Sequence, residues 1–354
     1  MNSRDFHPLT VLDTREELGG LAKTVMFDVP ASLRKSFAWR AGQHLSFRFV
    51  LDGEEHRRSY SISSSPVTAD PLRITVKRVR DGLISNHIND ALRPGDVIDV
   101  MPPFGGFCLD PGATLRRTHY FFGAGSGITP LFAMLSSVMA AEPNSFAHLA
   151  YGNTNEKSIL LEEELNAHQN ANPDRMSVHH VFSNPGWWSS ARYWRKGIID
   201  KAAIKALIEE NPPYAQDAQY YICGPGKMNT TLKKILMGFD VPDNRIHMES
   251  FGGAKDEDLS VEGIPATATV HLDDQTSTVP ITIGQTILDA ACKVGLNPPF
   301  SCQSGVCGAC KATLVSGTVH MRSHPALEEA EVEKGAILTC QSVATSGLLE
   351  VKFE

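Results

Sequence analysis

The stretch from Ser301 to Cys310, SCQSGVCGAC, constrains this chain more than any other segment. Its three cysteines are spaced C-x4-C-x2-C with small residues between them, and Cys340 follows downstream. Thiols gathered on one short irregular loop either form disulfides or bind metal. The chain holds seven cysteines in 354 residues, an odd number at low density. This count favours metal binding in a reducing compartment over a secreted disulfide framework.

Two kinds of metal site compete for these thiols. A structural zinc site usually shows two C-x2–4-C knuckles, which the remote Cys340 does not supply. The x4–x2 spacing with one distant cysteine is the plant-type pattern for a 2Fe–2S cluster. Gly305, Gly308 and Ala309 allow the backbone to fold tightly around cluster sulfides, which need N–H donors. We therefore predict these cluster ligands, with zinc as the alternative: Cys302, Cys307, Cys310 and Cys340.

Bulk composition excludes several classes of protein. The net charge of −7 and the pI near 6.0 lack the basic footprint of a nucleic-acid-binding domain. The N-terminus carries no apolar targeting segment, and the longest apolar run, 131–141, is about half a membrane span. We expect a cytoplasmic protein with no membrane and no nucleic acid among its partners.

The hydrophobic rhythm divides the chain into segments. Short strands at 24–30, 44–52, 57–65, 72–79 and 96–103, separated by Gly, Pro and Asp, predict a small antiparallel barrel. From about residue 117, strands alternate with helices, which predicts a parallel sheet wrapped by helices. A polar linker precedes a last β-rich region with one helix. The predicted segments are 1–115, 116–251, the linker 252–265, and 266–354.

Three motifs upstream indicate sites for anions and rings. RSYS, Arg58 to Ser61, lies on a predicted strand. In VKRVRDGLISNHI, Gly82 and Ser85 open a short helix, and unpaired N–H groups at a helix start favour a pyrophosphate. FFGAGSGITP, residues 121–130, joins a strand to a helix through a glycine turn, although it departs from the G-x-G-x-x-G fingerprint.

Together the three motifs resemble the ferredoxin–NADP reductase superfamily over about residues 8–251. The resemblance implies that one set of residues holds a flavin, predicted as FAD: Arg58, Tyr60, Ser61, Val76, Lys77, Gly82 and Ser85. It implies that a second set binds the nicotinamide nucleotide: Gly123, Gly125, Gly127, Thr129, Pro130, Cys223, Gly224 and Pro225.

Two further fragments fit that family. CGPG begins with Cys223 at the predicted end of a strand, where α/β sheets bind ligands. ESF, Glu249 to Phe251, resembles the family's segment beside the flavin ring, with Phe where plant reductases end in Tyr. We predict catalytic roles beside the flavin for Ser61, Cys223, Glu249 and Phe251. Two remaining cysteines, Cys108 and Cys292, are predicted to be structural.

The region 266–354 resembles plant-type ferredoxins, so the whole order resembles single-chain oxygenase reductases. The predicted fold is multidomain β and α/β: an antiparallel flavin-binding β-barrel, a parallel-sheet α/β nicotinamide domain and a β-grasp ferredoxin domain. The resemblance implies an oxidoreductase that passes electrons from NADH or NADPH through FAD and a 2Fe–2S cluster to a terminal oxygenase. Candidate partners are di-iron or Rieske hydroxylases of aromatic, CoA-ester or steroid catabolism.

Other interpretations of the same motifs stay open. A stand-alone diaphorase would use the same cofactors, and a non-enzymatic redox sensor would show no rapid turnover. Thr154 stands where NADPH-using relatives often have Arg, which favours NADH, although Lys157, Arg192 or Arg195 could bind a 2′-phosphate. Residues 266–354 carry 5 basic and 9 acidic residues, a surface that either steers a basic partner or is simply solvated.

Overall fold

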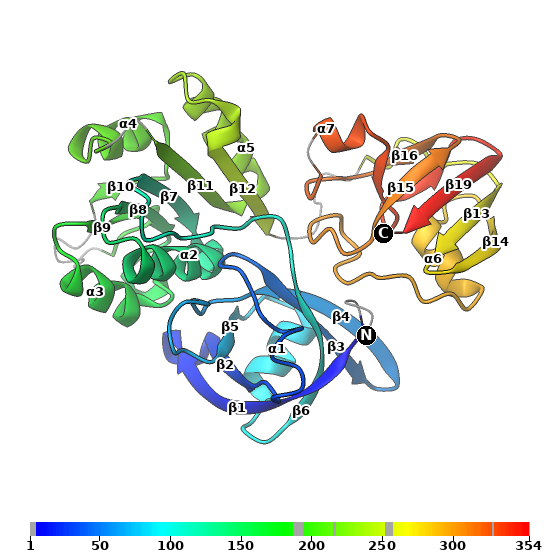
Figure 1. Cartoon of the computed structure of the whole chain (residues 1–354), viewed down its shortest axis with the longest axis horizontal. Helices are drawn as coiled ribbons and strands as arrows, with labels where there is room; N and C mark the ends of the chain where they lie inside the picture. Colours follow the sequence, from blue (N-terminus) through cyan, green and yellow to red (C-terminus); the bar gives the residue numbers. More distant parts are fainter. Residues whose placement is uncertain (1–4, 187–193, 215–216, 252–257, 328, 354) are drawn as a thin grey trace. The chain divides into compact units, whose positions relative to one another are not determined.

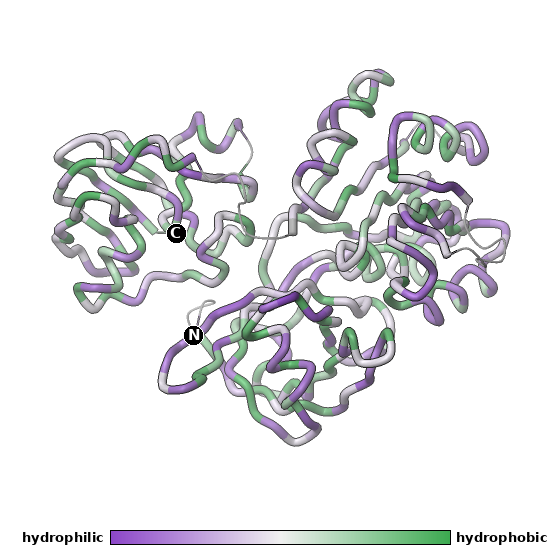
Figure 2. The backbone as a smooth tube through the Cα atoms, turned by 180° about the vertical axis from the view of Figure 1, so that it is seen from behind, coloured by the Kyte–Doolittle hydropathy of each residue, from purple (hydrophilic) through white to green (hydrophobic). Residues whose placement is uncertain are grey.

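The computed structural model describes residues 5–186, 194–214, 217–251, 258–327 and 329–353. The chain forms two compact units, Met1–Phe251 and Gly252–Glu354 (Figure 1). Each unit has hydrophobic cores of its own. Figure 2 shows hydrophobic and hydrophilic segments alternating along the chain in both units, as expected where each strand or helix buries one face.

The first part of unit 1 is a six-stranded antiparallel barrel with strand order β4-β3-β6-β1-β2-β5. An isolated bridge between Ile62 and Ile74 joins the two outer strands, so the sheet closes on itself. Helix α1, Leu83–Asp90, contacts β5 and β2. The strands are β1 His7–Glu17, β2 Ala22–Asp28, β3 His44–Leu51, β4 Glu54–Ser61, β5 Leu72–Lys77 and β6 Val97–Phe104.

The second part of unit 1 is a parallel sheet with strand order β10-β9-β8-β7-β11-β12. Its strands are β7 Thr118–Ala124, β8 Phe146–Asn153, β9 Met176–Phe182, β10 Arg195–Lys196, β11 Ala218–Pro225 and β12 Ile246–Phe251. The helices between them are α2 Ile128–Ala141, α3 Glu162–Ala171, α4 Lys201–Glu210 and α5 Gly226–Met237. Helix α2 is buried almost all round, which explains its nearly continuous apolar sequence.

One hydrophobic core runs across the junction between the barrel and the parallel sheet. It joins Ala41, Phe107 and Leu109 of the barrel part to the apolar side chains of β7 and α2. Gly42 lies at this junction with φ +101°, and a Cβ there would come within 2.1 Å of the Phe107 carbonyl oxygen and 2.3 Å of Met134 Cε. Only glycine therefore fits between the barrel loop and helix α2.

Unit 2 is a β-grasp sheet with strand order β14-β13-β19-β15-β17, with helix α6 Ile287–Lys293 and a short α7 Glu329–Val332. A second ladder pairs β16 with β18. The strands are β13 Ala266–Leu272, β14 Gln275–Ile281, β15 Lys311–Ser316, β16 Val319–Met321, β17 Ala336–Leu338, β18 Ser342–Ala344 and β19 Leu348–Phe353. In the described part of the chain, no helix combines the length and apolarity needed to cross a bilayer.

The structure adds strands that the sequence pattern did not predict. In strand β1 only Leu9 and Val11 are buried, so its charged second half has the sequence of a loop. Strand β12 extends the parallel sheet and carries Glu249. The single strand expected at 336–344 is broken into β17 and β18 by a turn at Cys340, which leaves the thiol outside the ladder.

The junction at Gly42 yields a stability prediction. Gly42→Ala should lower the free energy of unfolding by more than about 2 kcal/mol, because it adds a strained φ and a backbone clash. Gly95→Ala is the matched control, since Gly95 has φ +92° and no heavy atom of the described residues within 4 Å of its would-be Cβ. It should cost about 1 kcal/mol. Denaturant unfolding of both variants measures the difference, and equal losses would contradict the packing argument.

Candidate functional site

The glycine turn predicted at 121–130 forms at the end of β7. A 3-10 turn, Gly125–Gly127, connects β7 to α2. A Cβ at Gly127 would lie 2.1 Å from the carbonyl oxygen of Cys223, so the turn packs directly on β11. Gly125 has φ +53° and open space around its Cα, and its carbonyl accepts a hydrogen bond of 2.9 Å from the Tyr151 hydroxyl. The turn is thus rigidly held while Gly125 exposes backbone to a ligand.

The strand order places this turn at the topological switch point of the sheet. On one side β7 pairs with β8, the next strand in the chain. On its other side β7 pairs with β11, which comes much later in the chain. Parallel α/β sheets bind ligands in the crevice at such a point, at the carboxyl ends of the strands. Cys223 on β11 is paired in register with Gly123 on β7 and with Glu249 on β12. Gly123, Cys223 and Glu249 therefore lie side by side on neighbouring strands, at the edge of the sheet formed by the carboxyl ends of the strands.

Glu249 connects this edge to the barrel. Ser61 on β4 donates a hydrogen bond of 3.4 Å to Glu249 Oε2, and His44 Nδ1 on β3 lies 3.8 Å from Oε1. Burial raises the pKa of Glu249 to about 8, although the Ser61 hydrogen bond acts to lower it. Burial also raises the pKa of the Cys223 thiol, and the nearby carboxyl adds to that shift. Glu249 therefore keeps its proton to a higher pH than an ordinary carboxyl group does, and the Cys223 thiol beside it stays neutral.

The RSYS motif lies at the end of β4, whose last residue is Ser61. Arg58 is exposed, and its guanidinium donates to the carbonyl of Arg57 at 2.7 Å. Tyr60 packs against Phe47, with ring centroids 5.9 Å apart, and burial raises the pKa of its phenol. An exposed guanidinium and a neutral phenol two residues apart on one strand suit an anionic, aromatic ligand.

The predicted phosphate turn precedes α1. Gly82 is the N-cap of that helix, and no side chain among the described residues caps its first turn. A Cβ at Gly82 would lie 2.5 Å from Ser85 Oγ and 2.9 Å from Val79 Cβ, so a larger residue would force the turn to shift. The Ser85 hydroxyl accepts from the Val79 N–H at 3.2 Å and donates to the Gly82 carbonyl at 3.1 Å. Ser85 thus shapes the turn, while the backbone N–H groups of the first turn suit an anion.

Strand β5 supports α1 from below. Val76 is buried, Lys77 is half-buried, and the Val76 carbonyl accepts from Asn89 of α1 at 3.2 Å. The predicted residues Val76 and Lys77 therefore lie where β5 meets the helix.

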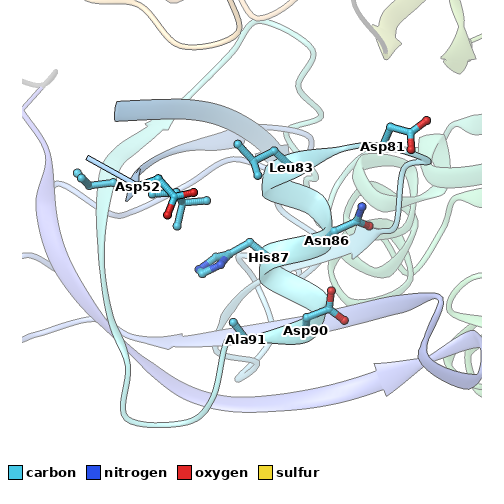
Figure 3. Close-up of a pocket in the computed structure, with 9 residues that line it drawn as sticks. Asp52, Asp81, Leu83, Asn86, His87, Asp90 and Ala91 are labelled. Atoms are coloured by element: carbon cyan, nitrogen blue, oxygen red, sulfur yellow. The ribbon is translucent and has the colours of Figure 1, made fainter. Parts of the chain in front are cut away.

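The outer face of α1 lines a pocket of about 690 Å³ together with the β3–β4 turn (Figure 3). Its lining includes the carboxylates of Asp52, Asp81 and Asp90 beside Leu83 and His87. Carboxylates repel a phosphate, so this pocket does not suit a pyrophosphate. The prediction of a phosphate site at α1 therefore concerns its N-terminal turn rather than this outer face.

The other residues predicted to contact the nicotinamide nucleotide or the flavin ring differ in their surroundings. The Thr129 hydroxyl donates to the Ser126 carbonyl at 3.0 Å and stabilises the turn, and Pro130 is buried in α2. A Cβ at Gly224 would meet Met228 Cε at 2.5 Å, and exposed Pro225 is the N-cap of α5. Strand β12 ends at Phe251, whose side chain lies outside the described residues.

The four cluster cysteines of unit 2 are grouped in two pairs. Cys302 is hydrogen-bonded to Cys307, and Cys310 is hydrogen-bonded to Cys340. Within the described ranges, no three His, Cys, Asp or Glu side chains converge as ligands of one metal ion. A zinc site needs four thiolates about 2.3 Å from a single point. Two pairs suit a two-iron cluster, in which each iron takes two thiolates.

Backbone N–H groups point at these sulfurs, as the loop composition predicted. The Ser304 N–H donates to Cys302 Sγ at 3.4 Å, and the N–H of Gly305 donates to Cys340. Gly305 has φ +74°, and a Cβ there would lie 2.8 Å from the Ser323 carbonyl oxygen. The hydrogen bond with the Cys307 thiol lowers the pKa of Cys302, and the Ser304 N–H acts in the same direction, whereas the same thiol pair raises the pKa of Cys307.

His44 is the member of the unit 1 site that the sequence motifs missed. It is paired in register with Ser61 across β3 and β4, and its ring packs edge-on against Phe104 at 4.2 Å. Gly105, with φ +123°, leaves room for the imidazole, because a Cβ would lie 2.9 Å from Nδ1. The only sequence signal is a histidine at the start of a strand next to the RSYS strand.

Cys108, predicted as structural, lies near the same carboxyl group. Burial raises the pKa of its thiol to about 11, although the nearby Arg40 guanidinium acts to lower it. Its Sγ donates to the Gly105 carbonyl at 3.2 Å, so the thiol holds the loop that makes room for His44.

Three family descriptions match successive parts of the chain. Residues 10–108 match an oxidoreductase FAD-binding domain, residues 121–234 an oxidoreductase NAD-binding domain, and residues 270–345 a 2Fe-2S iron-sulfur cluster binding domain. The cofactor classes inferred from the motifs are thereby confirmed: FAD, a nicotinamide nucleotide and a 2Fe–2S cluster.

Two relatives align with this chain over nearly their whole length, and the alignments span all three of these regions. One component of the 1,2-phenylacetyl-CoA epoxidase from Escherichia coli K12 is 31% identical over 99% of this chain and 98% of its own. The ferredoxin reductase component of 3-ketosteroid-9-alpha-monooxygenase from Rhodococcus rhodochrous is 32% identical over 98% and 96%. This chain belongs to the oxygenase reductase family. It is an oxidoreductase, and the predicted reductase class is confirmed over the diaphorase and sensor alternatives.

Solved structures support the fold. Phthalate dioxygenase reductase matches with a TM-score of 0.62 at 23% identity, covering 98% of each chain. An intact type IV self-sufficient cytochrome P450 monooxygenase matches with a TM-score of 0.70 at 23% identity, covering 98% of this chain and 41% of that chain. The predicted combination of antiparallel, parallel and ferredoxin-like domains is confirmed.

The raised pKa of Glu249 yields a pH prediction. Between its ordinary value of 4.5 and about 8, the unfolded chain loses this proton while the folded chain keeps it. Folding stability should therefore fall with rising pH by up to about 1.4 kcal/mol per pH unit across that window. Glu249→Gln lacks the titrating group, so it should gain stability relative to the parent reductase as pH rises from 5 to 8.

Denaturant unfolding at several pH values measures this difference. Glu163→Gln is the control, because Glu163 is exposed on α3 and its loss should not change the pH trend. Parallel pH profiles for the parent and Glu249→Gln would show that Glu249 ionises normally.

Proposed function

We propose that this reductase takes hydride from NADH in unit 1 and delivers single electrons from the thiol-bound cluster of unit 2 to a terminal oxygenase. The proposal keeps the predicted segments 1–115, 116–251, 252–265 and 266–354. The observation that carries it is the meeting of Ser61, Glu249 and Cys223, from two domains, at the switch point of the sheet. A flavin supplies the conversion of one hydride into two separate electrons, which neither a nicotinamide nor a 2Fe–2S cluster performs alone.

The barrel residues would bind and orient the flavin. Arg58 and the first-turn N–H groups after Gly82 suit the pyrophosphate, which favours FAD over FMN. Tyr60 offers a neutral ring, and Ser61 offers a hydroxyl at the end of β4, where the reacting edge would lie. Glu249, whose pKa is raised by burial, has Oε2 3.4 Å from Ser61 Oγ, and His44 Nδ1 lies 3.8 Å from its Oε1. Glu249 and His44 would thus serve as groups that can hold a proton next to the Ser61 hydroxyl.

The sheet residues would bind the nicotinamide nucleotide. Gly125 offers open backbone for phosphates, supported by Gly123, Gly127, Thr129 and Pro130, which fix the turn. Cys223, with Gly224 and Pro225 after it, presents a small neutral side chain at the crevice, where a planar ring can approach closely. Burial excludes water from this edge, and Phe251 remains a predicted contact of the flavin ring.

The proposed cluster ligands are the two thiol pairs of unit 2, Cys302 with Cys307 and Cys310 with Cys340. Their oxygenase partner is proposed as a di-iron or Rieske hydroxylase. The names of the relatives, a phenylacetyl-CoA epoxidase and a 3-ketosteroid-9-alpha-monooxygenase, support an oxygenase partner, and the di-iron or Rieske class is what the family resemblance implies. The acidic balance of 266–354 would favour a basic docking face on that partner.

The thiol pairs yield the decisive test of this electron path. Cys307→Ser should abolish NADH-driven cytochrome c reduction, because one iron loses a thiolate, while ferricyanide reduction at the flavin stays near the parent rate. Cys292→Ser is the control, since Cys292 is not among the proposed ligands, and it should keep both activities. Equal loss of both activities in Cys307→Ser would contradict the path.

Nucleotide choice yields a second test. Thr154 is exposed in the turn after β8, and Arg195 lies over the Trp194 ring at 4.6 Å, while Arg192 lies outside the described residues. The proposed preference is NADH, because Thr154 places no cation where a 2′-phosphate would lie. Thr154→Arg should raise kcat/KM for NADPH about tenfold, the effect of one charge-assisted hydrogen bond to the 2′-phosphate. Thr154→Gln, which lengthens the same side chain without adding a charge, is the control and should leave kcat/KM for NADPH at the parent value. A parent enzyme that strongly prefers NADPH would refute the NADH assignment.

A further inference from the structure

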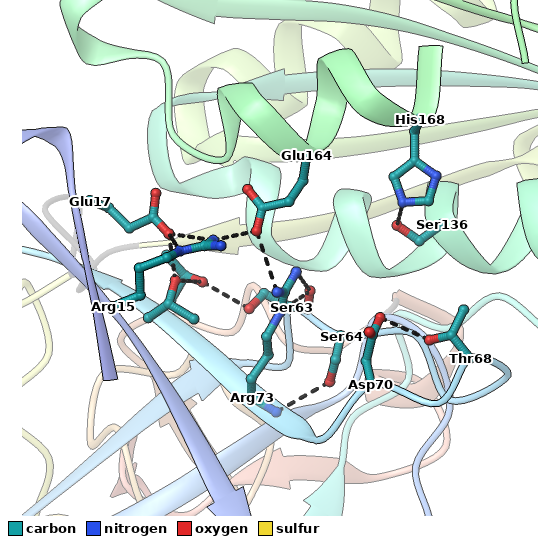
Figure 4. A network of polar contacts seen from close by, with 12 residues as sticks. Arg15, Glu17, Ser63, Ser64, Thr68, Asp70, Arg73, Ser136, Glu164 and His168 are labelled. Carbon is teal, nitrogen blue, oxygen red and sulfur yellow. Dashed lines mark hydrogen bonds and ion pairs between the residues drawn. The ribbon is translucent and has the colours of Figure 1, made fainter. Parts of the chain in front are cut away.

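A second polar contact joins the two domains of unit 1, on the side of helix α3 (Figure 4). Glu164 of α3 binds two arginines of the barrel through one oxygen. Arg15 on β1 donates to Glu164 Oε1, and Arg73 on β5 donates to the same oxygen at 3.4 Å. We call Arg15, Arg73 and Glu164 the Glu164 cluster. Their side chains are 42%, 10% and 20% exposed, so Arg73 and Glu164 are largely shielded from water.

Arg73 connects this cluster to the segment that follows Ser61. Its Nε and Nη2 donate to the Ser63 carbonyl at 3.2 and 3.1 Å, which leaves Nη1 for Glu164. Its guanidinium also lies over the Phe132 ring of α2, 5.6 Å from the centroid. All three contacts use the planar fork of arginine, which a lysine cannot reproduce. Arg73 therefore links the backbone two residues beyond Ser61 to helices α2 and α3 of the nicotinamide domain.

The same segment touches that domain at a second point. Ser65 Oγ and Ser137 Oγ of α2 lie 2.8 Å apart in a buried hydrogen bond. The Ser63 hydroxyl is bonded to Thr75 Oγ1 at 2.9 Å, and Thr75 to Thr24 Oγ1 at 2.9 Å, so the segment is fixed within the barrel as well. Residues 63–65 are thus held from both domains, immediately after the hydroxyl that meets Glu249.

We propose that Glu164 is a positioning residue for hydride transfer: through Arg15 and Arg73 it fixes the barrel, with Ser61, against the sheet edge that carries Cys223 and Glu249. This role rests on the function proposed above. Hydride transfer requires reacting atoms at about 3–3.5 Å, and a misplacement of about 1 Å can cost about a hundredfold in rate. Removal of the Glu164 charge weakens the attachment of both arginines to α3, and it alters none of Ser61, Cys223 and Glu249.

The test is Glu164→Gln in the flavin-loaded, full-length reductase, assayed by NADH-driven ferricyanide reduction per bound flavin. We expect kcat to fall about tenfold with a smaller change in KM, and the primary isotope effect with NADH deuterated at the transferred position to rise. Glu163→Gln, which removes the same charge from the exposed neighbour on α3, should leave rate and isotope effect at the parent values.

Arg15→Gln provides an independent variant, because Arg15 is partly exposed and its loss spares the core. It should show a smaller effect in the same direction, and the double variant should be no slower than Glu164→Gln alone. An unchanged rate and isotope effect in Glu164→Gln, or a loss of thermal stability with the parent isotope effect, would overturn the positioning role. A parent enzyme that does not oxidise NADH at all would instead refute the proposed function.

Discussion

The flavin-side chemistry proposed for this reductase depends on one buried carboxyl group, which belongs to the sheet and faces the barrel. Glu249 is part of the parallel sheet, yet its two oxygens lie beside Ser61 and His44 of the barrel. An ionised carboxylate would be costly in this apolar setting, and burial resolves the conflict by keeping the proton on the acid. A neutral acid within reach of a strand-end hydroxyl can exchange a proton without placing a charge in the crevice.

That contact is long and weak for a hydrogen bond, so it cannot align two domains by itself. Alignment comes from the interface around it: the shared core of barrel loop, β7 and α2, the glycine at position 42, and the Glu164 cluster at the α3 side. Apolar packing supplies most of the stability but little directional control. The forked hydrogen bonds of Arg73 supply direction, because they fix distance and angle together.

The chemistry of this protein could be predicted from its sequence better than the edges of its sheets. Cysteine spacing, the RSYS strand and the glycine turn depend on local geometry, so the cluster, the barrel and the parallel sheet could be inferred from them. Strand β1 was missed because its outward positions are charged, and only pairing with β2 and β6 reveals it. His44 was missed because it joins the site through register with Ser61, and Glu164 because its partners lie on two distant strands. Neither kind of long-range contact leaves a local pattern.

The two halves of the electron path differ in how their sites are built. All four thiols lie in unit 2, which has hydrophobic cores of its own, and Cys310 and Cys340 are part of one of them. The flavin-side site is divided between a barrel and a sheet, so its geometry depends on an interface. Disturbance of that interface should therefore slow hydride transfer and leave the thiol pairs intact, whereas loss of a thiol should leave the hydride step intact. The one-electron site is therefore held rigid by the cores of a single unit, whereas the two-electron site is held rigid by the contact between two domains.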